Sequence, residues 1–117
     1  MTTRDTIQAY FNSLKQKKDW ETFLSDDMIF TSYTSPIKRV TGKAAYLEAT
    51  KRFYSMITAL KVKDLVVDAN KACALTRYEL QPPRGSAFES HVAEVFEVRE
   101  GKIVSFDIYF DSAPFPK

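Results

Sequence analysis

The sequence predicts an α+β fold in which helices cover one face of an antiparallel sheet. Apolar residues recur with helical spacing in the first half of the chain, whereas after Lys61 they alternate with polar residues up to the C-terminus. Short clusters of turn-forming residues separate the alternating segments, so consecutive strands there are expected to be antiparallel. At 117 residues the chain has the usual size of one domain, and we expect a single domain over residues 1–117.

Three helices are expected in the first half. The first begins at Thr3 and has an apolar face whose members stand at i, i+3, i+4 and i+7: Ile7, Tyr10, Phe11 and Leu14. Asp19, a preferred N-cap residue, is expected to start a short second helix that ends near residues 25–27. The third opens at residues 41–42 and ends near Leu60, with a broad stripe formed by Tyr46, Leu47, Phe53, Tyr54 and Ile57.

The remaining segments are expected to be strands. Residues 28–34 are rich in β-branched and aromatic side chains, and residues 37–40 return after Pro36 to complete a hairpin. Four strands then follow in succession, at 62–68, 73–81, 88–99 and 102–111. The segments that join them contain Gly, Pro, Asn or Asp, which tolerate turn geometry.

Charge and hydropathy exclude several classes of protein. Seventeen Lys and Arg against fifteen Asp and Glu leave a formal net charge of +2, too small for the basic surface of a nucleic-acid-binding protein. The longest apolar stretch falls short of the ~20 residues that span a bilayer, and the first five residues do not resemble a targeting signal. We therefore expect a cytoplasmic protein with neither a nucleic-acid nor a membrane partner.

Other motifs give little support for a metal, a cofactor or a reactive thiol. Cys73 stands between two alanines and is expected to be a small buried strand residue. His91, the single histidine, falls on the outer face of its strand without a partner at metal-ligand spacing. The three glycines are isolated, so there is no phosphate-binding or dinucleotide-binding loop. Asp26 and Asp27 could form a paired acid site, but are expected to end a helix and meet water.

Alternation assigns one face of each strand to the interior beneath the helices. On the last strand the inward residues are Val104, Phe106, Ile108 and Phe110, and on the strand before it they are Phe88, Ser90, Val92, Glu94, Phe96 and Val98. Thr76, Tyr78 and Leu80 form the inner set of the preceding strand, and Phe30, Ser32 and Thr34 that of the early strand.

Glu94 is the exception on this inner face, because Val92 and Phe96 flank it. A carboxylate in such surroundings is costly to ionise without partners. It is either bonded structurally, for instance to a tyrosine hydroxyl, or it is a functional acid in a pocket. Hydroxyls that could serve either role belong to the four inward tyrosines, Tyr10, Tyr46, Tyr54 and Tyr78.

Five short strings carry a resemblance to a known superfamily: YFNSL at 10–14, KDW at 18–20, FLSDDMIF at 23–30, TGKAA at 41–45 and EGKIVSFDIYFD at 100–111. In this order they resemble the nuclear transport factor 2-like superfamily, especially its SnoaL-like and ketosteroid-isomerase-like members. The likeness covers nearly the whole chain. It implies a cystatin-like α+β roll, in which a cone-shaped, curved sheet is closed by the helices around a pocket, and a homodimer through the outer sheet face.

The resemblance also implies roles by position. In ketosteroid isomerases a tyrosine and a protonated acid form an oxyanion hole beside an aspartate base. Here the tyrosine position falls on Tyr10 and the acid on Glu94, but the base position falls on Ser32, which needs activation to act as a base. The acid/base aspartate of SnoaL-like cyclases falls on Ile108, and the histidine that often precedes it falls on Phe106.

These observations predict a cofactor-free protein that binds a small, mostly apolar molecule. The expected ligand-binding residues are Phe30, Ser32, Tyr54, Tyr78, Val92, Phe106, Ile108 and Phe110. The alternative is an isomerase, cyclase or dehydratase in which Glu94 is the general acid/base and Tyr10 or Tyr78 donates to an oxyanion. A further alternative is a non-catalytic dimeric interaction module.

The outer sheet face is expected to form the dimer interface. Its apolar residues are Leu75, Ala93, Val95 and Tyr109, and the charged residues between them are Arg77, His91, Glu97 and Asp107. Such a mixture suits a self-complementary two-fold contact, so we expect a homodimer.

Overall fold

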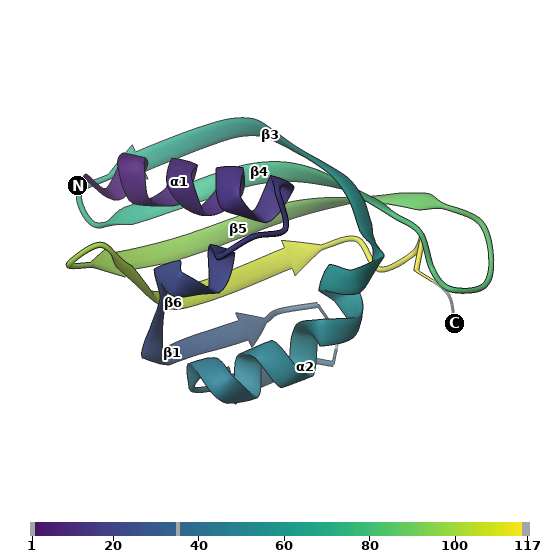
Figure 1. Ribbon diagram of the computed structural model, residues 1–117, viewed down its shortest axis with the longest axis horizontal. Coiled ribbons are helices and arrows are strands. Elements are labelled where there is room, and N and C mark those ends of the chain that lie inside the picture. The colour runs from purple at the N-terminus through teal and green to yellow at the C-terminus, as the bar shows by residue number, and fades with distance from the viewer. Residues whose placement is uncertain (1, 35, 116–117) are drawn as a thin grey trace.

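The computed structural model describes residues 2–34 and 36–115. Within this part the chain forms two α-helices, one short 3₁₀ helix and six strands (Figure 1). In chain order they are α1 (Thr3–Lys15), η1 (Trp20–Phe23), β1 (Leu24–Ser32), β2 (Lys38–Thr41), α2 (Lys43–Met56), β3 (Ile57–Asp68), β4 (Lys71–Leu80), β5 (Phe88–Arg99) and β6 (Lys102–Phe110). The predicted α+β class is confirmed.

A capping box fixes the start of α1. The Asp5 amide donates to Thr2 Oγ1 over 3.0 Å, and the Thr2 amide donates to Asp5 Oδ2 over 3.2 Å. The predicted apolar face of the helix is buried, and Ile7 and Tyr10 on it are completely inaccessible. This face packs on β3, β4 and β5, so α1 covers one half of the sheet.

The predicted second helix is wrong beyond a single turn, because only the 3₁₀ helix η1 forms. Asp19 precedes it with φ of 59°, and its side chain caps no backbone amide. β1 begins at Leu24, earlier than expected, because Leu24 is buried and pairs with Ile103 of β6. Asp26 and Asp27 consequently lie exposed on a strand instead of ending a helix.

The helix α2 covers the other half of the sheet, against β1 and β2. It starts after Gly42, whose φ of +95° is a left-handed conformation that favours glycine. It ends at Met56 and not near Leu60, because Ile57 already pairs with Leu80 of β4.

The six described strands form one curved sheet in the order β2-β1-β6-β5-β4-β3, and both α-helices lie on its concave side (Figure 1). Neighbouring strands are antiparallel, except that β1 and β6 run parallel. The sheet is therefore mixed rather than wholly antiparallel. This parallel pair joins the early hairpin to the four-stranded meander.

A β-bulge between β5 and β6 overturns the inward placement of Val104. Ile103 pairs with Val98, whereas Ser105 pairs with Glu97, so Val104 is the extra residue. Ile103 is fully buried, and Val104 is half-buried beside Ser105 on the outer face. Beyond the bulge the predicted alternation holds.

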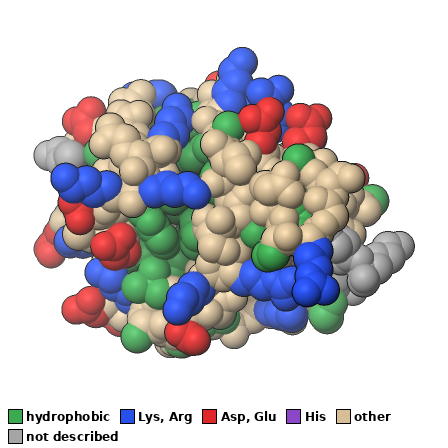
Figure 2. Space-filling view, turned by 45° about the vertical axis from the view of Figure 1, so that its right-hand side comes forward, with side chains coloured by type: hydrophobic (Ala, Val, Ile, Leu, Met, Phe, Trp, Pro, Cys, Tyr) green, Lys and Arg blue, Asp and Glu red, His purple; other side chains and the backbone are tan. Residues whose placement is uncertain are grey.

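The surface of the molecule mixes both signs of charge. Figure 2 shows Lys and Arg side chains interspersed with Asp and Glu around exposed apolar side chains on one face. Among the described residues, no helix has the length and apolar character needed to cross a membrane.

Candidate functional site

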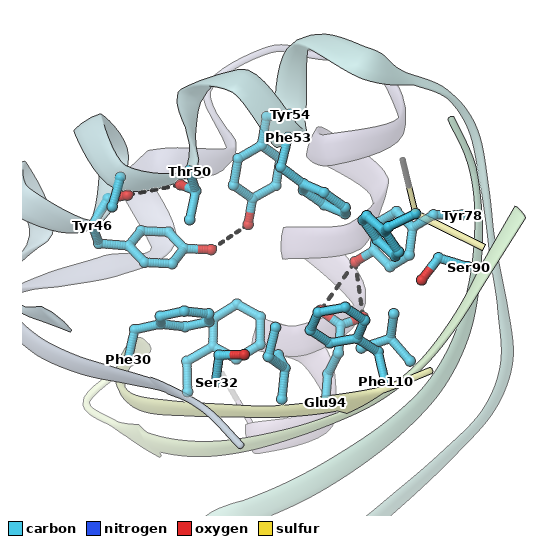
Figure 3. A pocket seen from close by; sticks show the side chains of 15 residues that line it. Phe30, Ser32, Tyr46, Thr50, Phe53, Tyr54, Tyr78, Ser90, Glu94 and Phe110 are labelled. Atoms are coloured by element: carbon cyan, nitrogen blue, oxygen red, sulfur yellow. Dashed lines mark hydrogen bonds between the residues drawn. The ribbon is translucent and has the colours of Figure 1, made fainter. Parts of the chain in front are cut away.

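A cavity of about 190 Å³ lies between α2 and the concave face of the sheet (Figure 3). The residues that line it are Phe30, Ser32, Tyr46, Ala49, Thr50, Phe53, Tyr54, Tyr78, Ser90, Val92, Glu94, Phe106, Ile108, Phe110 and Phe115. Aromatic and aliphatic side chains make up most of this wall. Among the described residues that line it, Glu94 is the one carboxyl group.

Regular backbone periodicity brings these side chains together. On α2 the lining residues stand at i, i+3, i+4, i+7 and i+8, which is one helix face: Tyr46, Ala49, Thr50, Phe53 and Tyr54. On the strands, inward residues alternate with outward ones, as Ser90, Val92 and Glu94 do on β5. The cavity is therefore the space between one helix face and one sheet face.

Glu94 is 2% exposed, and both of its oxygens accept hydrogen bonds. Thr76 Oγ1 donates to Oε2 over 2.7 Å. The Tyr78 hydroxyl lies 2.8 Å from Oε2 and 3.0 Å from Oε1 (Figure 3). Both donors come from β4, which pairs with β5 and so places them on the same inner face. The sheet register thus supplies the partners that a buried carboxyl requires.

Burial raises the pKa of Glu94 from 4.5 to about 7, although the hydrogen bonds from Thr76 and Tyr78 favour the charged form. The carboxyl therefore exchanges its proton near neutral pH. A group with this property is chemically suited to act as an acid or as a base.

Three tyrosine hydroxyls form a chain beside the cavity. The Tyr54 hydroxyl is hydrogen-bonded to that of Tyr46 and lies 3.4 Å from that of Tyr10. Burial raises the pKa of all three well above the usual value, so the hydroxyls keep their protons and remain hydrogen-bond donors. Tyr46 and Tyr54 line the cavity, whereas Tyr10 lies behind it against Phe96 and Phe106.

The cavity contains nine of the ten site residues that the sequence predicts. They are Phe30, Ser32, Tyr54, Tyr78, Val92, Glu94, Phe106, Ile108 and Phe110. Tyr10, the tenth, is fully buried and is not among the lining residues.

Six lining residues were not predicted as site residues: Tyr46, Ala49, Thr50, Phe53, Ser90 and Phe115. The helical spacing of α2 and the alternation of β5 could have identified the first five. Phe115 follows the last strand and packs on Phe88 and Phe110, and no sequence periodicity extends to it.

The positions to which the resemblance assigns the superfamily's bases lie at this cavity but hold side chains that are not bases. Ser32 comes from β1, and Phe106 and Ile108 come from β6. Asp107 lies on the opposite face of β6, where it is level with Val95 of β5. Glu94 is consequently the one carboxyl that the described part of the chain offers for acid/base chemistry in this cavity.

Cys73 and His91 lie outside the cavity lining, on the outer face of the sheet. Cys73 is a strand residue of β4 as expected but is only half-buried, and burial raises the pKa of its thiol. His91 is exposed on β5, with Nδ1 2.9 Å from Lys63 Nζ and Nε2 3.5 Å from Glu89 Oε1. Across residues 2–34 and 36–115, no three His, Cys, Asp or Glu side chains form a group that could hold a metal ion.

The fold is shared with many solved structures. An NTF2-like protein from Burkholderia thailandensis superposes with a TM-score of 0.83 at 17% identity, over 97% of this chain and 94% of that one. A proposed isomerase from Bacillus subtilis superposes with a TM-score of 0.78 at 22% identity, over 97% of this chain and 91% of that one. An LEH-like epoxide hydrolase from M. tuberculosis superposes with a TM-score of 0.77 at 20% identity, over 96% of this chain and 84% of that one. At these identities the likeness shows the fold alone.

At the level of sequence, no curated protein matches significantly. The SnoaL-like domain family matches residues 5–106, which contain α1 except its first two residues, all of α2, five complete strands and the first half of β6. On this match the chain belongs to the SnoaL-like domain family, and it shares the fold of solved NTF2-like proteins.

Proposed function

We propose that this protein binds a small, mostly apolar molecule in the cavity beneath α2. The observation that carries the proposal is the cavity itself, about 190 Å³ of space with predominantly apolar walls. An apolar cavity of ~150 Å³ in another protein accommodates benzene, so this one has room for about one substituted ring. Glu94 and Tyr78 offer the ligand a polar contact at the sheet side of the cavity.

Toluene tests the cavity directly, since it is a single ring without a hydrogen-bonding group. NMR titration should show saturable binding that shifts the resonances of lining residues. Val92→Phe should weaken this binding at least tenfold, because the larger side chain enters the cavity. Val66→Phe is the matched control, because it adds the same bulk at an exposed position on β3. Absence of binding, or equal affinities in the two variants, would contradict the proposal.

The ligand itself can be sought in the protein as purified. Native mass spectrometry should reveal an added mass that disappears on denaturation, and Val92→Phe should carry less of it. Organic extraction of the sample would then identify the compound class.

A second candidate function is acid/base catalysis by Glu94, of the isomerase, cyclase or dehydratase type. It is favoured by one observation, the carboxyl with a pKa of about 7 in a cavity wall. Tyr78 is better placed than Tyr10 to assist, because Tyr78 lines the cavity and contacts Glu94. Once a substrate is known, Glu94→Gln should abolish turnover and leave its binding nearly intact. Unchanged turnover would eliminate this role.

We also propose that the protein forms a homodimer through the outer sheet face. A dimer is compatible with ligand binding and with catalysis, and the alternative of a non-catalytic interaction module requires it. Leu75, Ala93 and Tyr109 are level with one another across β4, β5 and β6. Leu75 is 41% exposed and Tyr109 is 49% exposed. The Tyr109 ring stacks on the Tyr33 ring, with 5.0 Å between the ring centroids. This row gives the face an apolar centre suited to a two-fold contact. A cytoplasmic location remains a prediction.

A further inference from the structure

Ser90 is a buried hydroxyl without a hydrogen-bond partner in a wall of the cavity. Its side chain is 1% exposed, and within the described residues its Oγ bonds to no other group. Buried polar groups in folded proteins nearly always have a partner, and an unpaired one is costly. The exception at Ser90 therefore calls for a partner from outside the chain.

The other hydroxyls around the cavity already have partners or can meet water. Tyr78 donates its proton to Glu94. The Tyr54 hydroxyl lies between those of Tyr46 and Tyr10, so Tyr46 can donate to Tyr54 and Tyr54 to Tyr10. Thr50 Oγ1 donates to the carbonyl oxygen of Tyr46 over 2.7 Å (Figure 3). Ser32 is only half-buried, so solvent reaches it. Among the described lining residues, Ser90 is thus the buried hydroxyl with a free proton to donate.

Ser90 and Glu94 mark two separate polar positions on one wall. They are four residues apart on the inner face of β5, which corresponds to about 13 Å along an extended strand. Tyr78 pairs with Ser90 in the sheet register, and its side chain extends to the carboxyl of Glu94. The ring of Tyr78 therefore occupies the wall between the two polar groups, and a ligand of about one ring that lies over it can be contacted at the Ser90 end.

We propose that Ser90 Oγ donates a hydrogen bond to an acceptor oxygen of the ligand, so that the cavity selects ring compounds bearing a carbonyl or ether group. This inference rests on the proposed binding function and specifies the chemistry of the ligand. The donor is a neutral hydroxyl in apolar surroundings. A neutral acceptor therefore suits it better than an anion, which would lose its hydration without a compensating charge.

Cyclohexanone and methylenecyclohexane form a matched pair of probes, because they differ only by an oxygen in place of a CH₂ group. Binding of each is measured by NMR titration to the unsubstituted protein and to Ser90→Ala. The loss of one neutral hydrogen bond should weaken cyclohexanone binding roughly threefold to tenfold. Methylenecyclohexane should change by less than about twofold, because it has no acceptor.

Two further variants guard the comparison. Ser55→Ala makes the same substitution at an exposed position on α2 outside the cavity lining, so it should leave both affinities unchanged. Ser90→Cys keeps the shape of the side chain with a somewhat larger atom and replaces the hydroxyl by a weak donor, so it gives the same test if Ser90→Ala does not fold.

The outcomes separate the two proposals. If both probes bind and Ser90→Ala weakens them equally, or weakens neither, the role of Ser90 is refuted and the apolar cavity stands. If neither probe binds the unsubstituted protein, the binding function and this inference fail together.

Discussion

The raised pKa of Glu94 predicts that the protein loses stability as the pH rises through neutrality. Between pH 4.5 and about 7 the folded state holds a proton on this carboxyl that the unfolded chain has released. Raising the pH through this window therefore favours unfolding, and the loss levels off above pH 7. The difference between 4.5 and about 7 corresponds to roughly 3 kcal/mol of unfolding free energy, of which about 2 to 3 kcal/mol falls between pH 5 and pH 8.

Glu94→Gln isolates this contribution, because glutamine imitates the protonated carboxyl at every pH. Urea unfolding at pH 5, 6, 7 and 8 should show the unsubstituted protein losing about 2 to 3 kcal/mol relative to the variant. Glu79→Gln is the matched control, since Glu79 is exposed on β4 and its substitution should leave the pH profile unchanged. Parallel profiles for the unsubstituted protein and Glu94→Gln would refute the reasoning.

Three further predictions concern stability and assembly. Phe106→Ala should lower the unfolding free energy by about 3 to 5 kcal/mol in urea titrations, because Phe106 is 2% exposed and its ring centroid lies 4.5 Å from that of Phe96. A loss below about 1 kcal/mol would contradict this. Thr2→Ala removes the capping box with Asp5 and should cost about 1 kcal/mol by the same measurement, whereas an unchanged midpoint would show that the cap is dispensable. In sedimentation equilibrium at micromolar concentration, the unsubstituted protein should have twice the chain mass and Val95→Arg the mass of one chain; a monomeric unsubstituted protein would exclude the proposed dimer.

The sequence predicts the inner face of β4 and β5 well, because the burial of alternate residues leaves a strong period of two. It fails at Val104 because a bulge depends on how two strands pair, which single-strand alternation does not record. It also fails at Leu24, where helical spacing continues from η1 although pairing with Ile103 commits the residue to a strand.

In the site as well, the sequence predicts what local periodicity determines and misses what strand pairing determines. Glu94 is conspicuous in the sequence because it interrupts an apolar face, and the cavity contains it. Its hydrogen bonds to Thr76 and Tyr78 depend on the register of β4 against β5, which local periodicity does not determine. Whether a buried hydroxyl such as Ser90 finds a partner depends likewise on tertiary packing.

The parallel pairing of β1 with β6 has a consequence for how the protein folds. β6 is the last of the six described strands along the chain, yet in the sheet it lies between β1 and β5. During synthesis the β1–β2 hairpin and the β3–β5 meander emerge first, each with an unpaired edge where β6 will insert. Such distant pairing closes long loops and slows folding, so nascent chains expose these edges to aggregation until β6 arrives. β6 also supplies Phe106, Ile108 and Phe110 to the cavity. A ligand can therefore stabilise only those chains in which β6 has already paired with β1 and β5.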